Sequence, residues 1–269
     1  MSTVWIYRSP AQLLDDLGIS EPGDLRIEAI AQYCRATVRY KQLEGCEARL
    51  IGFGDRAIIA VNKVSRRERQ RFSVGHELGH WMRDHAKVAF TAFSCSEKAF
   101  LSEWSGDNPE RRANRYATEL LLPEAMFRQR AKNREITFST VRELAKQFQM
   151  SLTATAIRLV ELGSFPSAVV CNERNNRRWF FVDSDVPKVL RLRDEPGRDT
   201  LAYDLLRNGE PIYGPVDVYA DSWIDHEDAG RYSLREDSIK ITLPDNTRYV
   251  LSLLWWKDEK QLLDLEEDS

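Results

Sequence analysis

Apolar side chains recur with helical spacing in the segment 66–83. Val74, Leu78 and Trp81 stand at positions i, i+4 and i+7, so they share one stripe of a helix that faces a core. Ser65 begins a capping-box sequence, Ser-x-x-Glu, which is typical of a helix start. The pattern therefore predicts a core-facing helix over about residues 66–83.

The flanking segments predict further short elements. Proline suits the first turn of a helix, and Asp107 or Asn108 can cap a helix that begins near Pro109. Upstream, the sequence predicts amphipathic helices and strands, with Gly54-Asp55 as a turn. The expected helices span 12–17 and 24–35, and the expected strands span 36–43, 49–53 and 57–61.

The pattern changes in the second half of the chain. Residues 137–162 predict a compact two-helix unit, in which Thr140 and Glu143 have capping-box spacing. Strands follow, and the sequence predicts two hairpins and an acidic, frayed tail from 257 to 269. The hairpin strands are expected at 168–171 with 179–182, and at 238–243 with 248–255.

These elements predict an α+β fold in two domains. The first, residues 1–164, combines a helical core with a small antiparallel sheet and ends in the two-helix unit. The second, residues 165–269, is strand-rich and could bind a partner or sense a ligand.

Composition narrows the class of protein. The chain has 269 residues, 42% hydrophobic and 30% charged, which suits a sizeable core with a solvated surface. The formal net charge of −3 gives no whole-chain attraction to nucleic acid or to an anionic membrane. Four scattered cysteines without a CxxC pair suit a reducing cytosol. We see no signal peptide and no apolar run of roughly 18 residues, so we expect a cytoplasmic protein without a membrane segment.

The string His76-Glu77-Leu78-Gly79-His80 carries the chemistry. Residues four apart lie on one helix face, so both imidazoles can reach the same metal ion. Zn–N bonds of about 2.0–2.1 Å require such convergence. Glu77 lies about 100° around the helix from His76, where its carboxylate can act as general base on the attacking water. Gly79 has no side chain, so a neighbouring element can pack closely against this helix.

A catalytic zinc site needs a third protein ligand and an open position. Glu110 fits best, because it lies in the first turn of the next predicted helix, where a carboxylate also suits the helix dipole. Glu97, Glu103 and Glu119 are the other acidic candidates, and spacing alone leaves Glu103 open. Glu119 is expected on the helix face opposite Glu110, so only one of these two can point at the metal.

Two linked motifs resemble those of the ImmA/IrrE-type metallopeptidase family. The first runs from Arg69 to His80 as Arg-Gln-Arg-Phe-Ser-Val-Gly-His-Glu-Leu-Gly-His. The second is Glu110-Arg-Arg-Ala-Asn-Arg-Tyr-Ala117, followed by Leu-Leu-Leu-Pro123. The likeness covers roughly residues 25–163. It implies a zinc endopeptidase with one zinc ion per chain, in which Glu110 is the third ligand and Glu77 is the base.

The same resemblance implies a narrow substrate. Members of the family commonly cleave a helix-turn-helix transcriptional repressor, which would connect this chain to transcription regulation or a stress response. We expect Asn114, one turn past Glu110, to support a ligand from behind, and Tyr116 to line the site or to hold the helix in place. His85 is turned away from the ligand face, and His226 is interpreted as a surface residue.

The two-helix unit resembles a helix-turn-helix, but its pattern is poor for reading bases. The first turns of its second helix, 152–156, carry no Arg, Lys, Asn or Gln, and Arg158 lies beyond them. The basic stretch 128–134 leaves nonspecific phosphate contact open. We therefore predict a structural unit without direct nucleic-acid recognition. Two rival functions stay open: a DNA-binding or ligand-sensing regulator with structural zinc, and a toxin-like member of a two-gene module.

Overall fold

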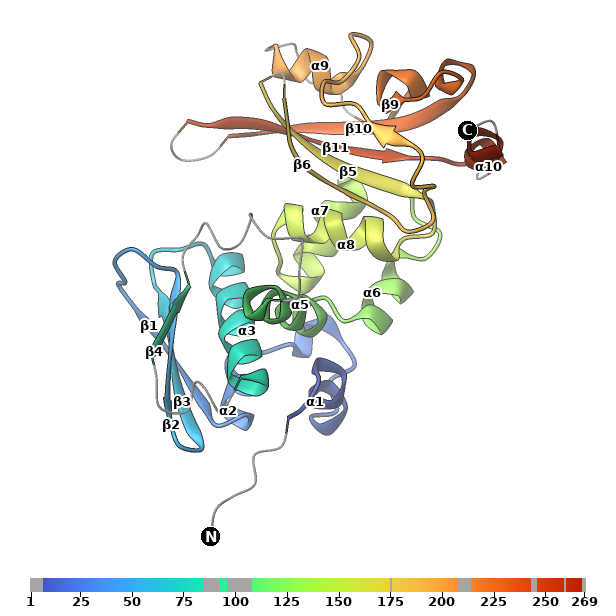
Figure 1. Cartoon of the computed structure of the whole chain (residues 1–269). Coiled ribbons are helices and arrows are strands. Elements are labelled where there is room, and N and C mark those ends of the chain that lie inside the picture. The colour runs from blue at the N-terminus through green and yellow to red at the C-terminus, as the bar shows by residue number, and fades with distance from the viewer. Residues whose placement is uncertain are drawn as a thin grey trace. The chain divides into compact units, whose positions relative to one another are not determined.

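The computed structural model describes residues 7–84, 92–95, 108–174, 176–207, 214–242, 246–258 and 260–267. Contacts divide the chain into two compact units, each with its own sheet (Figure 1). The N-terminal unit comprises residues 1–127 and 146–151, and the C-terminal unit comprises 128–145 and 152–269. In the described part of the chain, no helix is long and apolar enough to cross a bilayer.

The sheet of the N-terminal unit has four strands in the order β1-β3-β2-β4. They are β1 (Ala36–Lys41), β2 (Ala48–Phe53), β3 (Arg56–Asn62) and β4 (Ala92–Cys95). The α+β class is as predicted, but β1 pairs with β3 in parallel, so the sheet is mixed and not purely antiparallel. Strands β2 and β3 form a tight hairpin, whose turn contains Gly54 at a φ of +58°. β3 lies between β1 and β2 in the sheet, so β1 pairs with β3 and not with β2, which follows it in the sequence.

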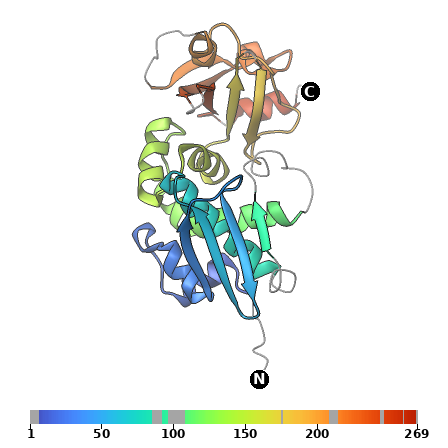
Figure 2. The same ribbon diagram turned by 90° about the vertical axis from the view of Figure 1, so that its left-hand side faces the viewer.

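Helices cover one face of this sheet, which Figure 2 shows with the helices behind the strands. They are α1 (Pro10–Asp16), η1 (Pro22–Asp24), α2 (Ile27–Tyr33), α3 (Arg67–Arg83) and α5 (Pro109–Leu121). The predicted helices at 66–83 and from Pro109 are thus confirmed. The capping box at Ser65 is not formed, because Arg66 occupies the cap position and the hydroxyl of Ser65 donates to Glu47 at 2.6 Å.

Alternation along the strands builds the core of the N-terminal unit. Leu50, Ile59 and Val61 are fully buried, as are Val74 and Leu78 on α3. The predicted stripe continues to Trp81, which is also fully buried and donates its indole N–H to the carbonyl of Cys34 at 2.8 Å. This burial fixes which face of α3 turns away from the sheet, and that face carries the two histidines.

Three helices follow: α6 (Glu124–Ala131), α7 (Phe138–Phe148) and α8 (Leu152–Leu162). The last two confirm the predicted two-helix unit. Its first cap lies one turn earlier than expected, because the hydroxyl of Thr137 accepts a hydrogen bond from the backbone N–H of Thr140 at 3.2 Å. Glu143 forms an ion pair with Arg134 instead of completing a capping box.

The C-terminal unit contains a five-stranded antiparallel sheet in the order β6-β5-β11-β10-β8. Both predicted hairpins are present. The strands are β5 (Ser167–Glu173), β6 (Asn176–Val182), β8 (Val216–Tyr219), β10 (Ser233–Thr242) and β11 (Arg248–Trp255), and β7 (Arg191–Leu192) pairs with β9 (Ile224–Asp225). Helix α8 packs on one face of the large sheet and α9 (Leu201–Leu206) on the other (Figure 1), so β5 and β11 are buried on both faces.

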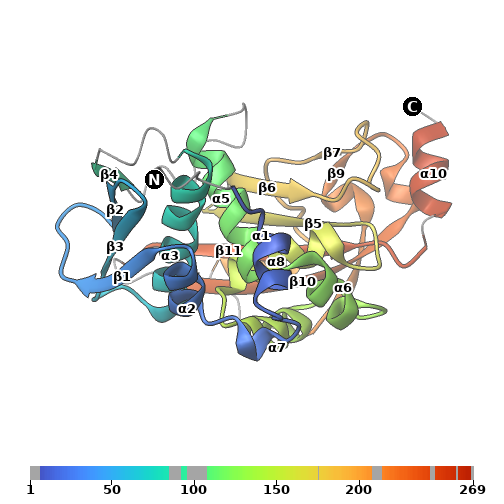
Figure 3. The same cartoon turned by 90° about the horizontal axis from the view of Figure 1, so that it is seen from below.

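Short elements complete this unit: η3 (Ala220–Ser222), η4 (Ala229–Arg231) and α10 (Lys260–Glu267). The expected frayed tail is therefore wrong for residues 260–267, which form the helix at the C-terminal end in Figure 3. The helix forms because Leu262 and Leu265 bury themselves in the core that includes Trp223 and Trp256.

A hydrogen bond connects the start of α7 to the sheet of the C-terminal unit. The backbone N–H of Phe138 donates to the carboxylate of Asp237 on β10 at 2.7 Å, and burial raises the pKa of Asp237. This contact helps to explain why residues 128–145 group with the strands that follow them. The domain boundary near residue 165 stays a prediction.

Candidate metal centre

Two histidines on α3 and one glutamate on α5 converge. The Nε2 atoms of His76 and His80 lie 3.1 Å apart. Each also lies 3.3 Å from an oxygen of Glu110: His76 from Oε2 and His80 from Oε1. One ligand atom from each residue falls within 4.8 Å of the other two, which makes this group a possible metal site.

The spacing of these atoms fits a tetrahedral metal ion. An ion with bonds of about 2.0–2.1 Å separates neighbouring tetrahedral ligands by about 3.3–3.4 Å. The separations of 3.1 and 3.3 Å already match that edge length closely. Two imidazoles and one carboxylate also form a donor set typical of catalytic zinc, with a fourth position left for water or substrate. The three residues can therefore hold a metal ion without a large rearrangement.

Local structure holds Glu110 at this point. Asn108 caps α5, because its side-chain oxygen accepts from the backbone N–H of Arg111 at 2.7 Å, and Pro109 follows at the first position. Glu110 lies in the first turn, where the helix dipole favours a negative charge. Contacts with the imidazoles of His76 and His80 hold the pKa of Glu110 well below its usual range. The carboxylate is thus ionised, as a metal ligand must be.

Small residues bring the two helices close enough for this convergence. A Cβ atom built on Gly79 would lie 3.0 Å from Cα of Ala113, and one on Gly75 would lie 3.2 Å from Cβ of Ala117. Glycines four apart on α3 therefore face alanines four apart on α5. The absence of a side chain at Gly79 predicted this close packing of the two helices. The packing sets the position of Glu110 relative to the two histidines.

Further contacts orient the imidazole rings from behind. His76 Nδ1 lies 2.8 Å from Oδ1 of Asn114, so Nδ1–H donates and Nε2 is left to face the metal position. His80 Nδ1 lies 3.5 Å from Oδ2 of Asp84, which also pairs with Arg112 at 3.6 Å. Sequence reasoning missed Asp84, although its position four residues after His80, at the C-cap of α3, was a usable signal.

Residues 31–160 match the family described as the IrrE N-terminal-like domain, peptidase family M78. This segment is similar to an IrrE N-terminal-like domain. It is the family that the two motifs predicted, and it contains the helices that carry His76, His80 and Glu110. No curated protein matches the sequence.

A solved structure described as a Mycobacterium tuberculosis transcriptional regulator resembles this chain. The TM-score is 0.57 at 11% sequence identity, and the match covers 91% of this chain and 73% of that chain. At this identity the likeness concerns the fold alone.

The other predicted site residues within the matched segment have different surroundings. Glu77 follows the first histidine and is fully buried. Tyr116 is also buried, but it lies on the packing face of α5 beside Gly79, and its hydroxyl donates to the backbone carbonyl of Arg8 at 3.0 Å. Glu119 pairs with Arg115 at 2.8 Å and does not join the cluster. The alternatives Glu97 and Glu103, and His85, lie outside the described residues.

Proposed function

We propose that this chain is a zinc-dependent endopeptidase. His76, His80 and Glu110 would hold one zinc ion, and Glu77 would act as general base. The observation that carries the proposal is the convergence of the three ligand side chains beside a buried glutamate. The match of residues 31–160 to a peptidase family supports the same interpretation.

The chain's own residues would divide the chemistry between them. A bound zinc ion polarises a scissile carbonyl and lowers the pKa of water to about 7. Glu77 would accept a proton from the attacking water and deliver it to the leaving amine, as a general base and then a general acid. Asn114 and Asp84 would keep the two imidazoles oriented toward the metal position.

We further propose a regulatory role in the cytoplasm, with a helix-turn-helix transcriptional repressor as the protein substrate. Support comes from the family resemblance, and the protein whose solved structure is similar is itself described as a transcriptional regulator. Direct reading of DNA by this chain is disfavoured. Arg158 is buried and paired with Glu161 at 2.6 Å, and Thr155 is fully buried, so these residues of α8 turn toward protein and not toward bases.

Zinc content tests the metal site. We would measure zinc per chain by elemental analysis for wild type, Glu110→Ala and the matched variant Glu119→Ala, purified without added metal. Wild type and Glu119→Ala should hold close to one zinc, and Glu110→Ala should lose most of it, since a ligand is removed only there. Full occupancy in Glu110→Ala would exclude Glu110 as the third ligand.

Cleavage tests the catalytic role. We would express the chain with candidate helix-turn-helix repressors from the same genome and follow each repressor by mass spectrometry. Glu77→Gln should retain zinc but lose cleavage, because it removes the base and spares the ligands. If Glu77→Gln still binds zinc and still produces the effect of the wild-type protein in cells, cleavage is not its function. A regulator with structural zinc or a toxin-like protein then becomes the better interpretation.

A further inference from the structure

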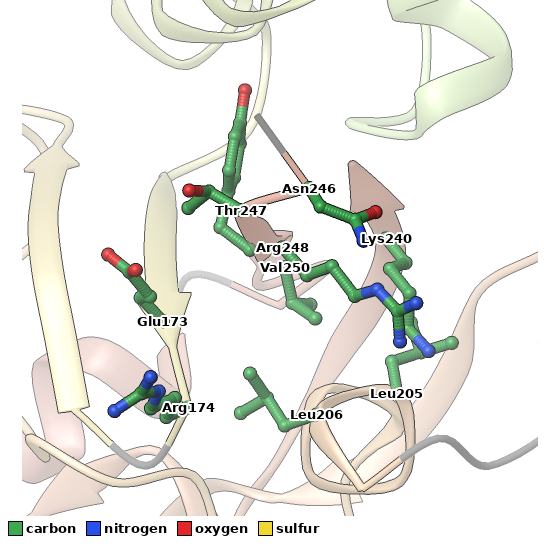
Figure 4. A pocket seen from close by; sticks show the side chains of 10 residues that line it. Glu173, Arg174, Leu205, Leu206, Lys240, Asn246, Thr247, Arg248 and Val250 are labelled. Atoms are coloured by element: carbon green, nitrogen blue, oxygen red, sulfur yellow. The ribbon is translucent and has the colours of Figure 1, made fainter. Parts of the chain in front are cut away.

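A cavity of about 410 Å³ opens at one end of the large sheet of the C-terminal unit (Figure 4). Its volume lies within the range of about 300–1,000 Å³ that is typical of small-molecule sites. Leu205 and Leu206 of α9 and Val250 of β11 supply apolar lining. Every described residue that lines the cavity belongs to this unit, so the cavity is separate from the metal centre.

Three cations stand among the described residues that line the cavity. Lys240 comes from β10 and Arg248 from β11, while Arg174 follows the last residue of β5. Figure 4 shows Lys240 and Arg248 on one side, with Glu173 and Arg174 across from them. Within this described lining Glu173 is the one carboxylate, so the formal charge there is 3 − 1 = +2. Glu173 also lies 3.5 Å from Arg178, which offsets part of its charge.

Strand register explains why these cations lie together. Lys240 pairs with Val250, and Thr242 pairs with Arg248, so all four residues point to the same face of the sheet. Val250 belongs to the core that also contains Leu205 of α9. Lys240 and Arg248 are therefore diagonal neighbours at the rim of this core, where β10 and β11 approach their hairpin turn.

The turn at Arg174 is unfavourable for arginine. Glu173 pairs with Asn176, so Arg174 begins the connection between β5 and β6, and its φ is +57°. Glycine or asparagine is preferred at this position, because a larger side chain is strained in the left-handed region. The second hairpin has the preferred asparagine, Asn246, at a φ of +68°. Asparagine at position 174 would relieve this strain and remove a cation from the cavity lining at the same time.

We infer that this cavity binds a small phosphorylated molecule. Guanidinium groups match phosphate oxygens with paired hydrogen bonds, and an ammonium group adds a point charge. Among the described lining residues, cations outnumber the carboxylate, which favours an anion. The leucine side chains provide an apolar surface for an organic group attached to the phosphate. The C-terminal unit would thus sense a phosphorylated metabolite.

Calorimetric titration of the full chain tests the inference. The probes are adenosine 5′-monophosphate, inorganic pyrophosphate and uncharged adenosine. We expect at least one of the two anions to bind, with an affinity that falls as salt is added, and adenosine to bind far more weakly. Failure of both anions to bind at millimolar concentration, or equal binding of adenosine and its monophosphate, would overturn the inference.

A pair of double variants separates the cavity from general surface charge. Lys240→Gln with Arg248→Gln should weaken anion binding by about tenfold or more, because charge-assisted hydrogen bonds are lost. Lys188→Gln with Arg198→Gln removes the same charge from exposed positions of the same unit. This control should bind like wild type, and an equal loss in both would contradict a specific site.

Arg174→Asn gives a readout that does not depend on the other variants. Asparagine suits the turn, so this change should raise Tm while it weakens anion binding. A purely structural role for Arg174 would raise Tm without any change in binding, and that result would contradict the inferred site.

Discussion

His76 Nδ1 lies 2.8 Å from Oδ1 of Asn114, one helix turn beyond the glutamate that faces the other side of the same ring. The contact fixes the tautomer of His76, so that Nε2 is available for a metal. Asn114→Ala should therefore weaken zinc affinity by about tenfold, the lower end of the usual cost of losing such a partner. Competition with a chelator would measure this.

Asn114→Asp is the control for that prediction, because a carboxylate can also accept from Nδ1–H. We expect it to retain most of the wild-type affinity. If Asn114→Ala binds zinc as tightly as wild type, the hydrogen bond does not support the site.

Gly79 is predicted to be intolerant of a side chain. Gly79→Ala would gain up to about 1 kcal/mol from helix propensity. However, its Cβ would lie 3.0 Å from Cα of Ala113, and overpacking of this kind costs about 1–3 kcal/mol because backbone yields poorly. We expect a net loss of about 1 kcal/mol in unfolding free energy and weaker zinc binding, since Glu110 moves with α5.

Gly23→Ala is the matched control, because no atom lies within 4 Å of the added Cβ. Chemical denaturation and zinc titration would compare the two variants. Equal stability and equal zinc affinity in both would show that the close helix contact does not position Glu110.

Tyr116→Phe tests the role of the buried hydroxyl. Its hydrogen bond to the carbonyl of Arg8 joins α5 to the residues just before α1. Loss of the bond should lower the unfolding free energy by about 1 kcal/mol and leave zinc affinity unchanged. A fall in zinc affinity at constant stability would instead place Tyr116 among the residues that support the metal.

The buried carboxylate of Glu236 should make stability depend on pH. Burial raises its pKa, although it accepts hydrogen bonds from Leu201, Ala202, Trp223 and Ser238. Because the folded state then binds its proton more tightly than the unfolded state, this contribution is fully present below the unfolded pKa and is lost as pH rises through the folded pKa.

Glu236→Gln removes that titration. Gln leaves some of the donors unsatisfied, so the variant should be less stable than wild type at low pH, and the difference should narrow as pH rises. Denaturation at several pH values would measure the difference, with exposed Glu195→Gln as control. A difference that widens with rising pH would show that the folded pKa is lowered instead.

The sequence by itself determined the chemistry of α3. A period of about 3.6 residues places His76 and His80 on one face and Val74, Leu78 and Trp81 on another, whatever the rest of the chain does. Local signals also located α5, both helices of the two-helix unit and the two hairpins, because caps, prolines and turns act over a few residues.

Tertiary structure decided what depends on distant partners. Glu110 reaches the histidines because Gly75 and Gly79 admit Ala113 and Ala117, a contact between segments more than 30 residues apart. Distant partners also decide three other features. These are the parallel pairing of β1 with β3, the hydrogen bond from Phe138 to Asp237, and the burial of α10. The cationic cavity follows from strand register, since β5, β10 and β11 bring Arg174, Lys240 and Arg248 together only once the sheet has formed.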